Sequence, residues 1–241
     1  MYFTEEVKVT SYDCDFRNRL KISSAMRYMQ ETARQHLVWL GFPADVLAEE
    51  DMVFLLSKLT MKIHRIPEIR EEIVIGTAPT HTKGVRFIRE FVMDSKDGER
   101  LISAVSQWPL IQISSRKVLR PKDFNRDLSF QPESASEYIQ DIPFPKIEMP
   151  QEVLYSEEIK YSELDINNHV NNAVYGDFIC DAMPFELMSE ADINTFTVGF
   201  QNEAVIDDTI AIRRHAIADN EYFVTGNHSR AECFKGLVTF K

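Results

Sequence analysis

The sequence predicts an α+β protein built from two copies of one unit, each a long helix packed on several antiparallel strands. Three observations support this prediction: a proline-rich segment near the middle of the chain, the same order of elements on either side of it, and residues that match across the two sides at fixed spacings. Self-similarity of this kind is typical of a duplicated structural unit. Two such units could join edge strands and form one pseudo-dimeric sheet around two central helices.

The proline-rich segment separates the two halves. Five of the ten prolines lie between Ser114 and Glu152, at positions 121, 132, 143, 145 and 150. Proline cannot donate a backbone hydrogen bond, so such a run favours an extended connection over a core element. We therefore expect an N-terminal repeat over residues 1–113, a connector over 114–152 and a C-terminal repeat over 153–241.

The first repeat begins with the strand-like run EEVKVTSY, followed by the helical stretch SSAMRYMQETARQHLVWLGF. Apolar residues three or four positions apart run from Ile22 to Leu40, and Gly41 stands where a helix C-cap glycine is typical. Strands are expected at about residues 53–64, 72–80, 85–94 and 100–113. The last two flank DSKDGE, which is a hairpin signal.

The second repeat follows the same order. EVLYSEEIKY is the expected first strand, and a helix is expected from about Asn172 to Met183, where Pro184 stops it. Four strands should follow near residues 194–203, 208–217, 221–228 and 231–240.

The two repeats also match residue by residue. Asp15 and Asp165 are 150 positions apart, and the same spacing pairs Tyr28 with Phe178. Downstream, EIREEIVI matches VIDDTIAI at a spacing of 137. The repeats differ where the first has DFRNRLKIS and the second has DINNHVNNA, because arginines replace an asparagine and a histidine. Because the asparagine and histidine occur in the second repeat alone, the sequence suggests one active site and not two.

Length and composition limit the classes of protein. With 241 residues, 44% of them hydrophobic and 27% charged, the chain has an ordinary globular composition and can bury a sizeable core. A net charge of −11 argues against general binding to nucleic acids or anionic membranes. No apolar run has the length of a membrane span, and the start is unlike a signal or transit peptide. These features, with three scattered cysteines, predict a cytoplasmic protein.

The stretch SELDINNHVNNAVYGDF, residues 162–178, concentrates polar side chains ahead of a helix. Asp165, Asn167 and His169 alternate along it, which puts them on one side of an extended loop. Two plainer interpretations stay open: Asp165 and Asn171 as turn and helix-cap residues, and His169 as a structural histidine. A metal site has little support, since no second histidine or cysteine lies nearby. The chain also lacks the glycine-rich, serine-hydrolase and zincin motifs of other enzyme classes.

The run DINNHVNNAVY resembles the signature of the acyl-ACP thioesterases, plant and bacterial enzymes that release fatty acids from acyl carrier protein. DCDFRNRLKISSAMRYMQETA and WPLIQISSRKVLRP are similar to that family's N-terminal helix and to a segment after its fourth strand. The resemblance covers nearly the whole chain and implies the tandem, or double, hotdog fold. It also implies hydrolysis of an acyl-ACP thioester with no metal or organic cofactor. Bacterial members are the better match, because the plant transit peptide is missing here.

The resemblance places the family's catalytic set on Asp165, Asn167, His169 and Glu203. Plant members often carry a cysteine directly after that glutamate, whereas this chain has Ala204. Chemically, the N–H groups at a helix start could stabilise the oxyanion of a thioester intermediate, and Asn167 could add a donor or orient water. Glu203 could activate water or attack the carbonyl itself, and the sequence leaves both routes open, although we favour water activation together with His169. Without the resemblance, Glu203 would be interpreted as a solvated charge at a strand end.

Two further groups of residues have candidate roles in recognition. An acyl tunnel could involve Gly176, Phe178, Met26 and Met29, and further aromatic candidates are Phe54, Phe87, Phe91 and Phe196. Met and aromatic residues at such spacings nevertheless usually belong to a core. The segment SSRKVLRPKDFNR could dock the acidic carrier protein through Arg116, Lys117, Arg120 and Lys122. The competing interpretation of this segment is a solvated start of the connector.

Two other functions compete with acyl-ACP hydrolysis. An acyl-CoA thioesterase would share the fold, and the basic segment favours a protein carrier only weakly. A non-catalytic acyl-thioester binding protein would not need Asp165, Asn167 and His169, because binding an acyl chain depends on shape more than on titratable groups. No nucleic-acid or membrane partner is expected. A pseudo-dimer of this kind suffices as a monomer, and a homodimer is left open.

Overall fold

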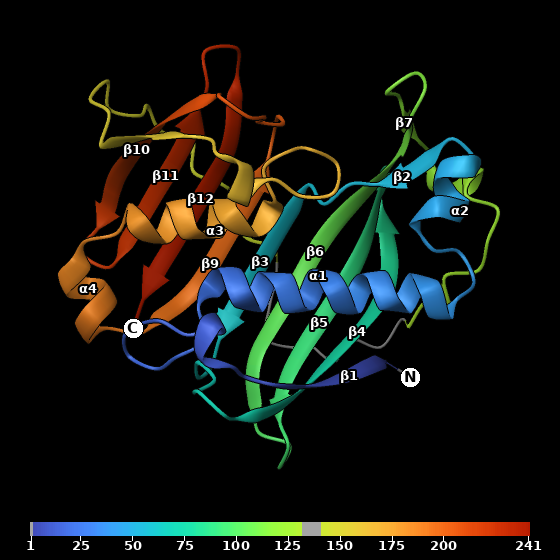
Figure 1. Cartoon of the computed structure of the whole chain (residues 1–241), viewed down its shortest axis with the longest axis horizontal. Coiled ribbons are helices and arrows are strands. Elements are labelled where there is room, and N and C mark those ends of the chain that lie inside the picture. Colours follow the sequence, from blue (N-terminus) through green and yellow to red (C-terminus); the bar gives the residue numbers. More distant parts are fainter. Residues whose placement is uncertain (1, 132–140) are drawn as a thin grey trace. The chain divides into compact units, whose positions relative to one another are not determined.

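The computed structural model describes residues 2–131 and 141–241 (Figure 1). Contacts divide the chain into two units. The first comprises Met1–Leu20 and Arg27–Gln140, and the second comprises Lys21–Met26 and Asp141–Lys241. The long first helix therefore starts within the second unit and continues in the first. The N-terminal part of the proposed connector, residues 114–140, is grouped with the first unit.

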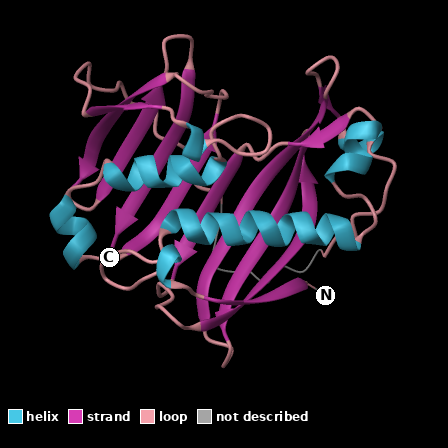
Figure 2. Ribbon diagram, in the orientation of Figure 1, coloured by secondary structure: helices cyan, strands magenta, loops and turns pink. Residues whose placement is uncertain are grey.

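The sheet of the first unit is antiparallel, in the order β1-β4-β5-β6-β3, and β2 and β7 pair with the end of β6 (Figure 2). Its strands are β1 (Phe3–Lys8), β2 (Met52–Phe54), β3 (Lys58–Ile63), β4 (Glu72–Lys83), β5 (Arg86–Ser95), β6 (Arg100–Gln112) and β7 (Val118–Leu119). Its helices are α1 (Ile22–Trp39) and α2 (Ala44–Glu49), and Figure 1 shows α1 lying across the sheet. The predicted strands are confirmed with two differences. The run at 53–64 divides into β2 and β3, and the first strand ends at Lys8, before Ser11–Asp13 form a short 3-10 helix. Helix α2 was not predicted, because six residues are too few for a periodic pattern to stand out.

Helix α1 buries one side and ends at a glycine, as the sequence predicts. Its fully buried side chains, three or four positions apart, include Met26, Met29 and Ala33. The chain then turns at Gly41, whose φ of +86° lies in the left-handed region that glycine adopts without strain. The Gly41 N–H donates to the Val38 carbonyl (3.0 Å), and the Phe42 N–H donates to the Leu37 carbonyl (3.1 Å). This pair of hydrogen bonds is the Schellman motif and confirms Gly41 as the helix stop.

The hydrophobic core of the first unit includes part of the proposed connector. Phe124 and Leu128 are buried in one cluster with Phe42, Leu47, Phe87 and Leu110. The Phe124 ring stands edge-on to the rings of Phe42, Phe54 and Phe87, with centroids 5.2 to 5.8 Å apart. Edge-to-face pairs add to the free energy that aromatic burial already contributes. Residues 121–128 therefore cover the core of this unit as well as leading out of it.

A buried polar cluster joins α1 to the sheet of the first unit. Nη1 of Arg89 donates to Nδ1 of His36 (3.1 Å) and to Oγ1 of Thr77 (3.1 Å), and all three residues are at most 6% exposed. The His36 ring also stacks on the rings of Phe3 and Trp39. Burial, together with the charge of Arg89, lowers the pKa of His36 to about 4. The imidazole is therefore neutral at pH 7, and its Nδ1 can accept the hydrogen bond from the arginine.

The second unit repeats the plan of the first. Its antiparallel sheet runs in the order β9-β12-β11-β10-β8. The strands are β8 (Tyr155–Glu158), β9 (Ile193–Phe200), β10 (Thr209–Ala218), β11 (Glu221–Asn227) and β12 (Glu232–Phe240). Helix α3 (Asn172–Asp181) crosses this sheet and stops before Pro184 as predicted, and the short α4 (Phe185–Glu190), which was not predicted, follows it (Figure 1).

Each repeat contains the same backbone hydrogen bonds, at positions that are related by the two spacings found in the sequence. The Val9 N–H donates to the Glu71 carbonyl (2.9 Å), and the Ile159 N–H donates to the Asp208 carbonyl (2.8 Å). Val9 and Ile159 are 150 positions apart, and Glu71 and Asp208 are 137 positions apart, as the sequence match predicts. Leu20 and Val170 repeat the pattern by donating to the carbonyls of Pro67 and Ala204 (2.8 and 2.9 Å). The sequence match therefore reflects the same backbone path in each unit.

The buried imidazole of His36 should make stability depend on pH. Its folded-state pKa of about 4 lies below its ordinary value of 6.5, so the unfolded chain binds more protons between these pH values. The stabilising contribution of neutral His36 is complete above pH 6.5 and is lost as the pH falls towards 4. We expect His36→Gln, which keeps an acceptor for Arg89 but cannot titrate, to lose less stability than the wild type over this range.

Urea unfolding of both proteins at pH 7, 5.5 and 4.5 measures this effect, because the carboxylates that also titrate are common to both. A difference in unfolding free energy that stays constant with pH would contradict the assignment.

Candidate active site

The polar loop before α3 is folded by the carboxylate of Asp165. Its Oδ1 accepts the backbone N–H of Asn167 (2.8 Å) and of His169 (3.4 Å), while the Asp165 N–H donates to the His169 carbonyl (2.8 Å). Asn168 takes a φ of +62°, which asparagine tolerates better than most residues. Oδ2 of Asp165 also lies 3.3 Å from the amide nitrogen of Asn167. The carboxylate thus fixes both the turn and the direction of the Asn167 side chain.

The first repeat contains the same turn without the same side chains. Oδ1 of Asp15 accepts the N–H groups of Arg17 (2.8 Å) and Arg19 (3.0 Å), and Asn18 has a φ of +59°. Asp165 therefore forms a turn, as one of the two plainer interpretations expected, and a catalytic role would be additional to this structural one. The side chains at 167 and 169 are what set the second loop apart, since asparagine and histidine stand where the first loop has two arginines.

The second loop is also held less tightly to the neighbouring segment. In the first repeat the Ile69 N–H donates to the Asn18 carbonyl (2.9 Å). Among the residues that the structure describes, no such hydrogen bond joins the equivalent Ile206 and Asn168. The tip of the second loop is correspondingly more open to a ligand.

His169 and Glu203 are brought together by this fold. Nε2 of His169 lies 3.4 Å from Oε2 of Glu203, and their side chains are 34% and 46% exposed. Glu203 follows β9, and the adjacent Ala204 carbonyl accepts the N–H of Val170 (2.9 Å). That backbone bond ties the two segments together next to the pair. An imidazole and a carboxylate at this distance, both open to water, can share and move a proton.

A histidine that the sequence analysis missed supports the Glu203 segment. Nδ1 of His228 accepts the N–H groups of Arg230 (3.1 Å) and Ala231 (3.0 Å), so its Nε2 carries the hydrogen. That Nε2 lies 3.2 Å from the carbonyl oxygen of Glu203, to which it can donate. The sequence offers no signal for this contact, because the two residues are joined only by the pairing of distant strands.

The start of α3 offers fewer open donors than the sequence suggested. The N-cap Asn171 uses its side-chain oxygen to accept the Ala173 N–H (2.9 Å), which confirms its helix-cap role. The Val174 N–H donates to the Asn171 carbonyl, and the Asn171 N–H donates to the Glu163 carbonyl (both 2.9 Å). These N–H groups are engaged within the protein and cannot donate to a substrate. The side-chain amide of Asn167 is therefore the better candidate donor to a substrate oxygen.

Four of the residues considered for an acyl tunnel, Gly176, Phe178, Met26 and Met29, are buried in packed surroundings. A Cβ placed on Gly176 would lie 2.8 Å from the sulfur of Met26, so the glycine permits close packing at that point of α3. The Phe178 ring packs near those of Tyr175 and Phe234. Met26 and Met29 are almost completely buried. Their role in holding an acyl chain stays a prediction.

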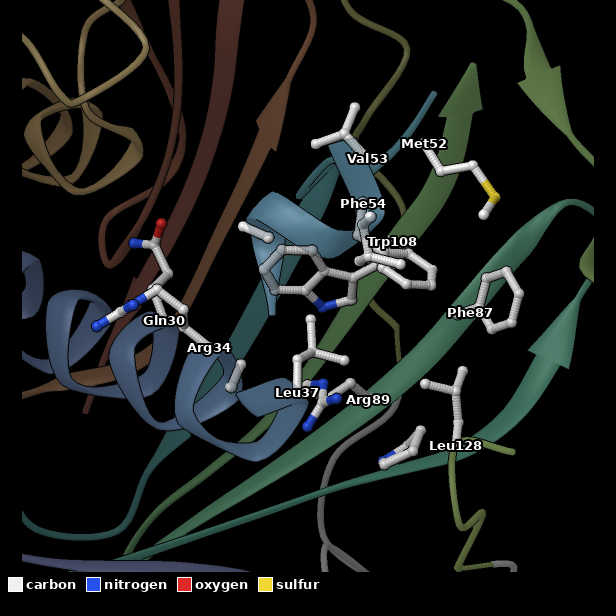
Figure 3. Close-up of a pocket in the computed structure, with 14 residues that line it drawn as sticks. Gln30, Arg34, Leu37, Met52, Val53, Phe54, Phe87, Arg89, Trp108 and Leu128 are labelled. Atoms are coloured by element: carbon white, nitrogen blue, oxygen red, sulfur yellow. The ribbon is translucent and has the colours of Figure 1, made fainter. Parts of the chain in front are cut away.

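A cavity of about 180 Å³ lies in the first unit, and none of those four residues lines it. Its apolar lining includes Leu37, Leu47, Phe54, Phe87, Trp108 and Leu128. Figure 3 labels Leu37, Phe54, Phe87 and Leu128 around the indole of Trp108, and Arg89 lies in the same group. Phe54 and Phe87 were considered as tunnel residues from the sequence, whereas Arg89 was not singled out. A mostly apolar cavity with a few polar groups is the usual form of a small-molecule site.

The basic residues proposed for docking lie on the hairpin between β6 and β7 and just beyond it. Arg116, Lys117, Arg120 and Lys122 are all exposed. The neighbouring Arg126 has a structural role instead, since it pairs with Glu50 and lies over the Phe42 ring. An exposed group of cations is available to an acidic partner, and its use for docking stays a prediction.

Two family models match the chain. The model for the acyl-ACP thioesterase N-terminal domain matches residues 1–126, and the model for the acyl-ACP thioesterase C-terminal domain matches residues 148–236. The chain is 23% identical over 217 residues to an acyl-[acyl-carrier-protein] hydrolase of Cuphea viscosissima, covering 84% of this chain and 52% of the relative. It is 23% identical to oleoyl-acyl carrier protein thioesterase 2 of Arabidopsis thaliana, covering 86% of this chain and 61% of the relative. The chain thus spans between half and two thirds of these curated relatives.

Solved structures establish the fold. An acyl-ACP thioesterase from Bacteroides thetaiotaomicron superimposes with a TM-score of 0.85 at 24% identity, covering 100% of this chain and 98% of that one. The 12:0-ACP thioesterase from Umbellularia californica superimposes with a TM-score of 0.87 at 18% identity, covering 100% and 97%. The tandem hotdog fold predicted from the sequence is confirmed.

The duplicated turn leads to a prediction about stability. Asp165→Ala removes an acceptor for two backbone N–H groups and should lower the free energy of unfolding by about 1 to 3 kcal/mol, the usual cost of lost hydrogen bonds to a charged group. Asp15→Ala should cost a similar amount, because the geometry is the same. Asp165→Asn keeps one acceptor oxygen and should cost less. Urea unfolding of the three variants measures these differences, and an Asp165→Ala protein as stable as the wild type would contradict the structural role.

Proposed function

The chain belongs to the acyl-ACP thioesterase family, and on that premise we propose that it hydrolyses the thioester of an acyl-ACP to a free fatty acid and the carrier thiol. The observation that carries the proposal is the pair of His169 and Glu203, 3.4 Å apart, beside the oriented amide of Asn167. The otherwise equivalent turn of the first repeat presents arginines, which stay protonated and cannot act as bases.

The reaction can be written with these side chains alone. Glu203, whose carboxylate lies 3.4 Å from Nε2 of His169, takes a proton from a water molecule as the water oxygen attacks the thioester carbonyl carbon. The Asn167 amide donates to the carbonyl oxygen as negative charge develops on it, and Asp165 holds that amide in place. The carbon–sulfur bond then breaks, and the leaving thiolate takes up the proton held by the pair. Exposure of both Glu203 and His169 gives water direct access to the base.

A cysteine nucleophile is not needed in this scheme. Ala204 stands directly after Glu203 and carries no thiol. Burial raises the pKa of the Cys233 thiol to about 11, so this cysteine is a neutral, weakly reactive thiol at pH 7. Direct attack by Glu203 on the thioester carbonyl is the competing route. In water labelled with oxygen-18, that route would put the label first into the carboxylate of Glu203 and only in later turnovers into the fatty acid.

Acyl carrier protein is the carrier that we propose, and acyl-CoA hydrolysis is the alternative. The exposed cations on and after the β6–β7 hairpin favour an acidic protein partner. A cytoplasmic location is kept as a prediction, and the plant relatives carry "chloroplastic" in their names. No helix in the described ranges is both long and apolar enough to cross a membrane.

The catalytic assignment predicts unequal effects at equivalent positions. Glu203→Gln and His169→Ala should each lower kcat by about 10² or more, the scale expected for a lost general base, while leaving the melting temperature near that of the wild type. Arg19→Ala, at the position matching His169, should leave kcat close to wild type. Acyl-ACP hydrolysis and thermal melts of the purified variants measure this. Loss of turnover in Arg19→Ala without unfolding would show that the first repeat also contributes to the chemistry.

The docking assignment predicts a carrier-dependent effect. Reversing Arg116 and Lys117 to glutamate should raise KM for acyl-ACP and reduce its dependence on salt, with a smaller effect on acyl-CoA. A matched control reverses Lys83 and Arg86, which are exposed at the β4–β5 hairpin. Equal changes in KM for the two pairs of substitutions would mean that net charge, and not this hairpin, governs association.

A further inference from the structure

Arg89 is a charged side chain in the wall of an otherwise apolar cavity. It projects from β5 and is 6% exposed, and it lines the cavity together with Leu37, Phe54 and Trp108 (Figure 3). The mechanism proposed above makes no use of it. A cation is rarely placed in such surroundings without a partner, because its transfer from water is expensive.

The partners of Arg89 are neutral. Nη1 donates to Nδ1 of His36 and to Oγ1 of Thr77, each at 3.1 Å. The Thr77 hydroxyl in turn donates to the Glu90 carbonyl (2.9 Å), so it is held as an acceptor for the arginine. Burial keeps His36 uncharged at neutral pH by lowering its pKa to about 4. Neither acceptor therefore neutralises the guanidinium.

No carboxylate in the described part of the chain accepts a hydrogen bond from Arg89. The adjacent Glu90 points to the other face of the strand, since successive strand residues alternate, and it accepts the hydroxyl of Tyr2 (2.9 Å). Burial lowers the pKa of Arg89 to about 10, which still leaves it protonated at pH 7. Within the described residues, Nε and Nη2 make no hydrogen bond, so three N–H groups have no protein acceptor.

Two other polar side chains of the lining, those of Trp108 and Arg34, are already engaged within the protein. The indole N–H of Trp108 donates to Oγ of Ser106 (2.7 Å). Arg34 makes two hydrogen bonds to Glu31 on the exposed side of α1. Of the two charged side chains in the lining, Arg89 is therefore the buried one, and it can present donors to a ligand in the cavity.

We propose that the cavity binds an aliphatic chain carrying an oxygen acceptor, and that Arg89 recognises this oxygen through Nε and Nη2. The proposed function identifies the chain as the acyl group of the thioester, so the substrate class becomes oxygen-bearing acyl groups, with a hydroxyl, oxo or carboxylate function. A plain hydrocarbon chain would cover the three N–H groups without pairing them. Such a site discriminates strongly, since an unpaired buried polar group is costly.

The competing explanation is that Arg89 only joins β5 to α1 through His36. That role needs Nη1 alone and predicts no preference among ligands. The two explanations therefore differ in binding selectivity, which a structural role would not alter.

Binding is measured by calorimetry with acylpantetheine amides, in which nitrogen replaces the thioester sulfur so that hydrolysis does not occur. The panel holds chains of one length that are unsubstituted or carry a hydroxyl, oxo or carboxylate group at successive positions. We expect the wild type to bind at least one oxygenated chain about tenfold or more tightly than the unsubstituted chain, the effect of about 1.4 kcal/mol. Arg89→Met, similar in length but without donors, should abolish that preference, whereas Arg86→Met on the exposed end of β5 should keep it.

Arg89→Gln separates the oxygen functions, because an uncharged amide can still donate to a hydroxyl or oxo group but loses the attraction to a carboxylate. Equal affinity of the wild type for all chains would overturn the inference, even if Arg89→Met failed to fold. Retention of the preference in a folded Arg89→Met protein would overturn it as well. Hydrolysis of the matching thioesters is assayed separately. Hydrolysis without selectivity would reject this inference alone, and selectivity without hydrolysis would reject the proposed function alone.

Discussion

The candidate active site depends on a carboxylate that folds its own loop. Asp165 accepts two backbone N–H groups from the residues that follow it, and this turn presents Asn167 and His169 towards the segment that carries Glu203. A charged acceptor in contact with local N–H groups holds a short loop without help from the core. The geometry of the site is therefore set by interactions within a few residues, and the sheet has only to supply the second segment.

Duplication separates the architecture of this loop from its chemistry. Asp15 forms the same turn in the first repeat, although that turn presents arginines where the second presents an asparagine and a histidine. An aspartate at this place in the repeat is thus a poor marker of activity by itself, because the fold requires it in both copies. The side chains two and four residues later are exposed or half-exposed, so they can change without disturbing the turn. One copy could keep a base while the other kept only the scaffold.

Features that depend on neighbours in sequence could be predicted, and those that depend on distant partners could not. The glycine stop of α1, the Asn171 cap and the paired repeats are local patterns or simple spacings. The support that His228 gives to Glu203 and the cluster around Arg89 join residues that only strand pairing brings together. Glu203 itself was found through the family resemblance, because one glutamate after a strand has no distinctive pattern. Phe124 was assigned to a connector since its proline-rich surroundings conceal a core position.

The position of Phe124 decides where this chain can be cut. A fragment ending at residue 113 would leave the rings of Phe42, Phe54 and Phe87 without the aromatic partner that now packs on them. Uncovered apolar surface of that kind favours self-association over folding. Complementing half-proteins, or a fluorescent domain inserted between the repeats, therefore need a junction beyond Leu128. By its contacts the first unit includes residues beyond 113, the expected end of its repeat.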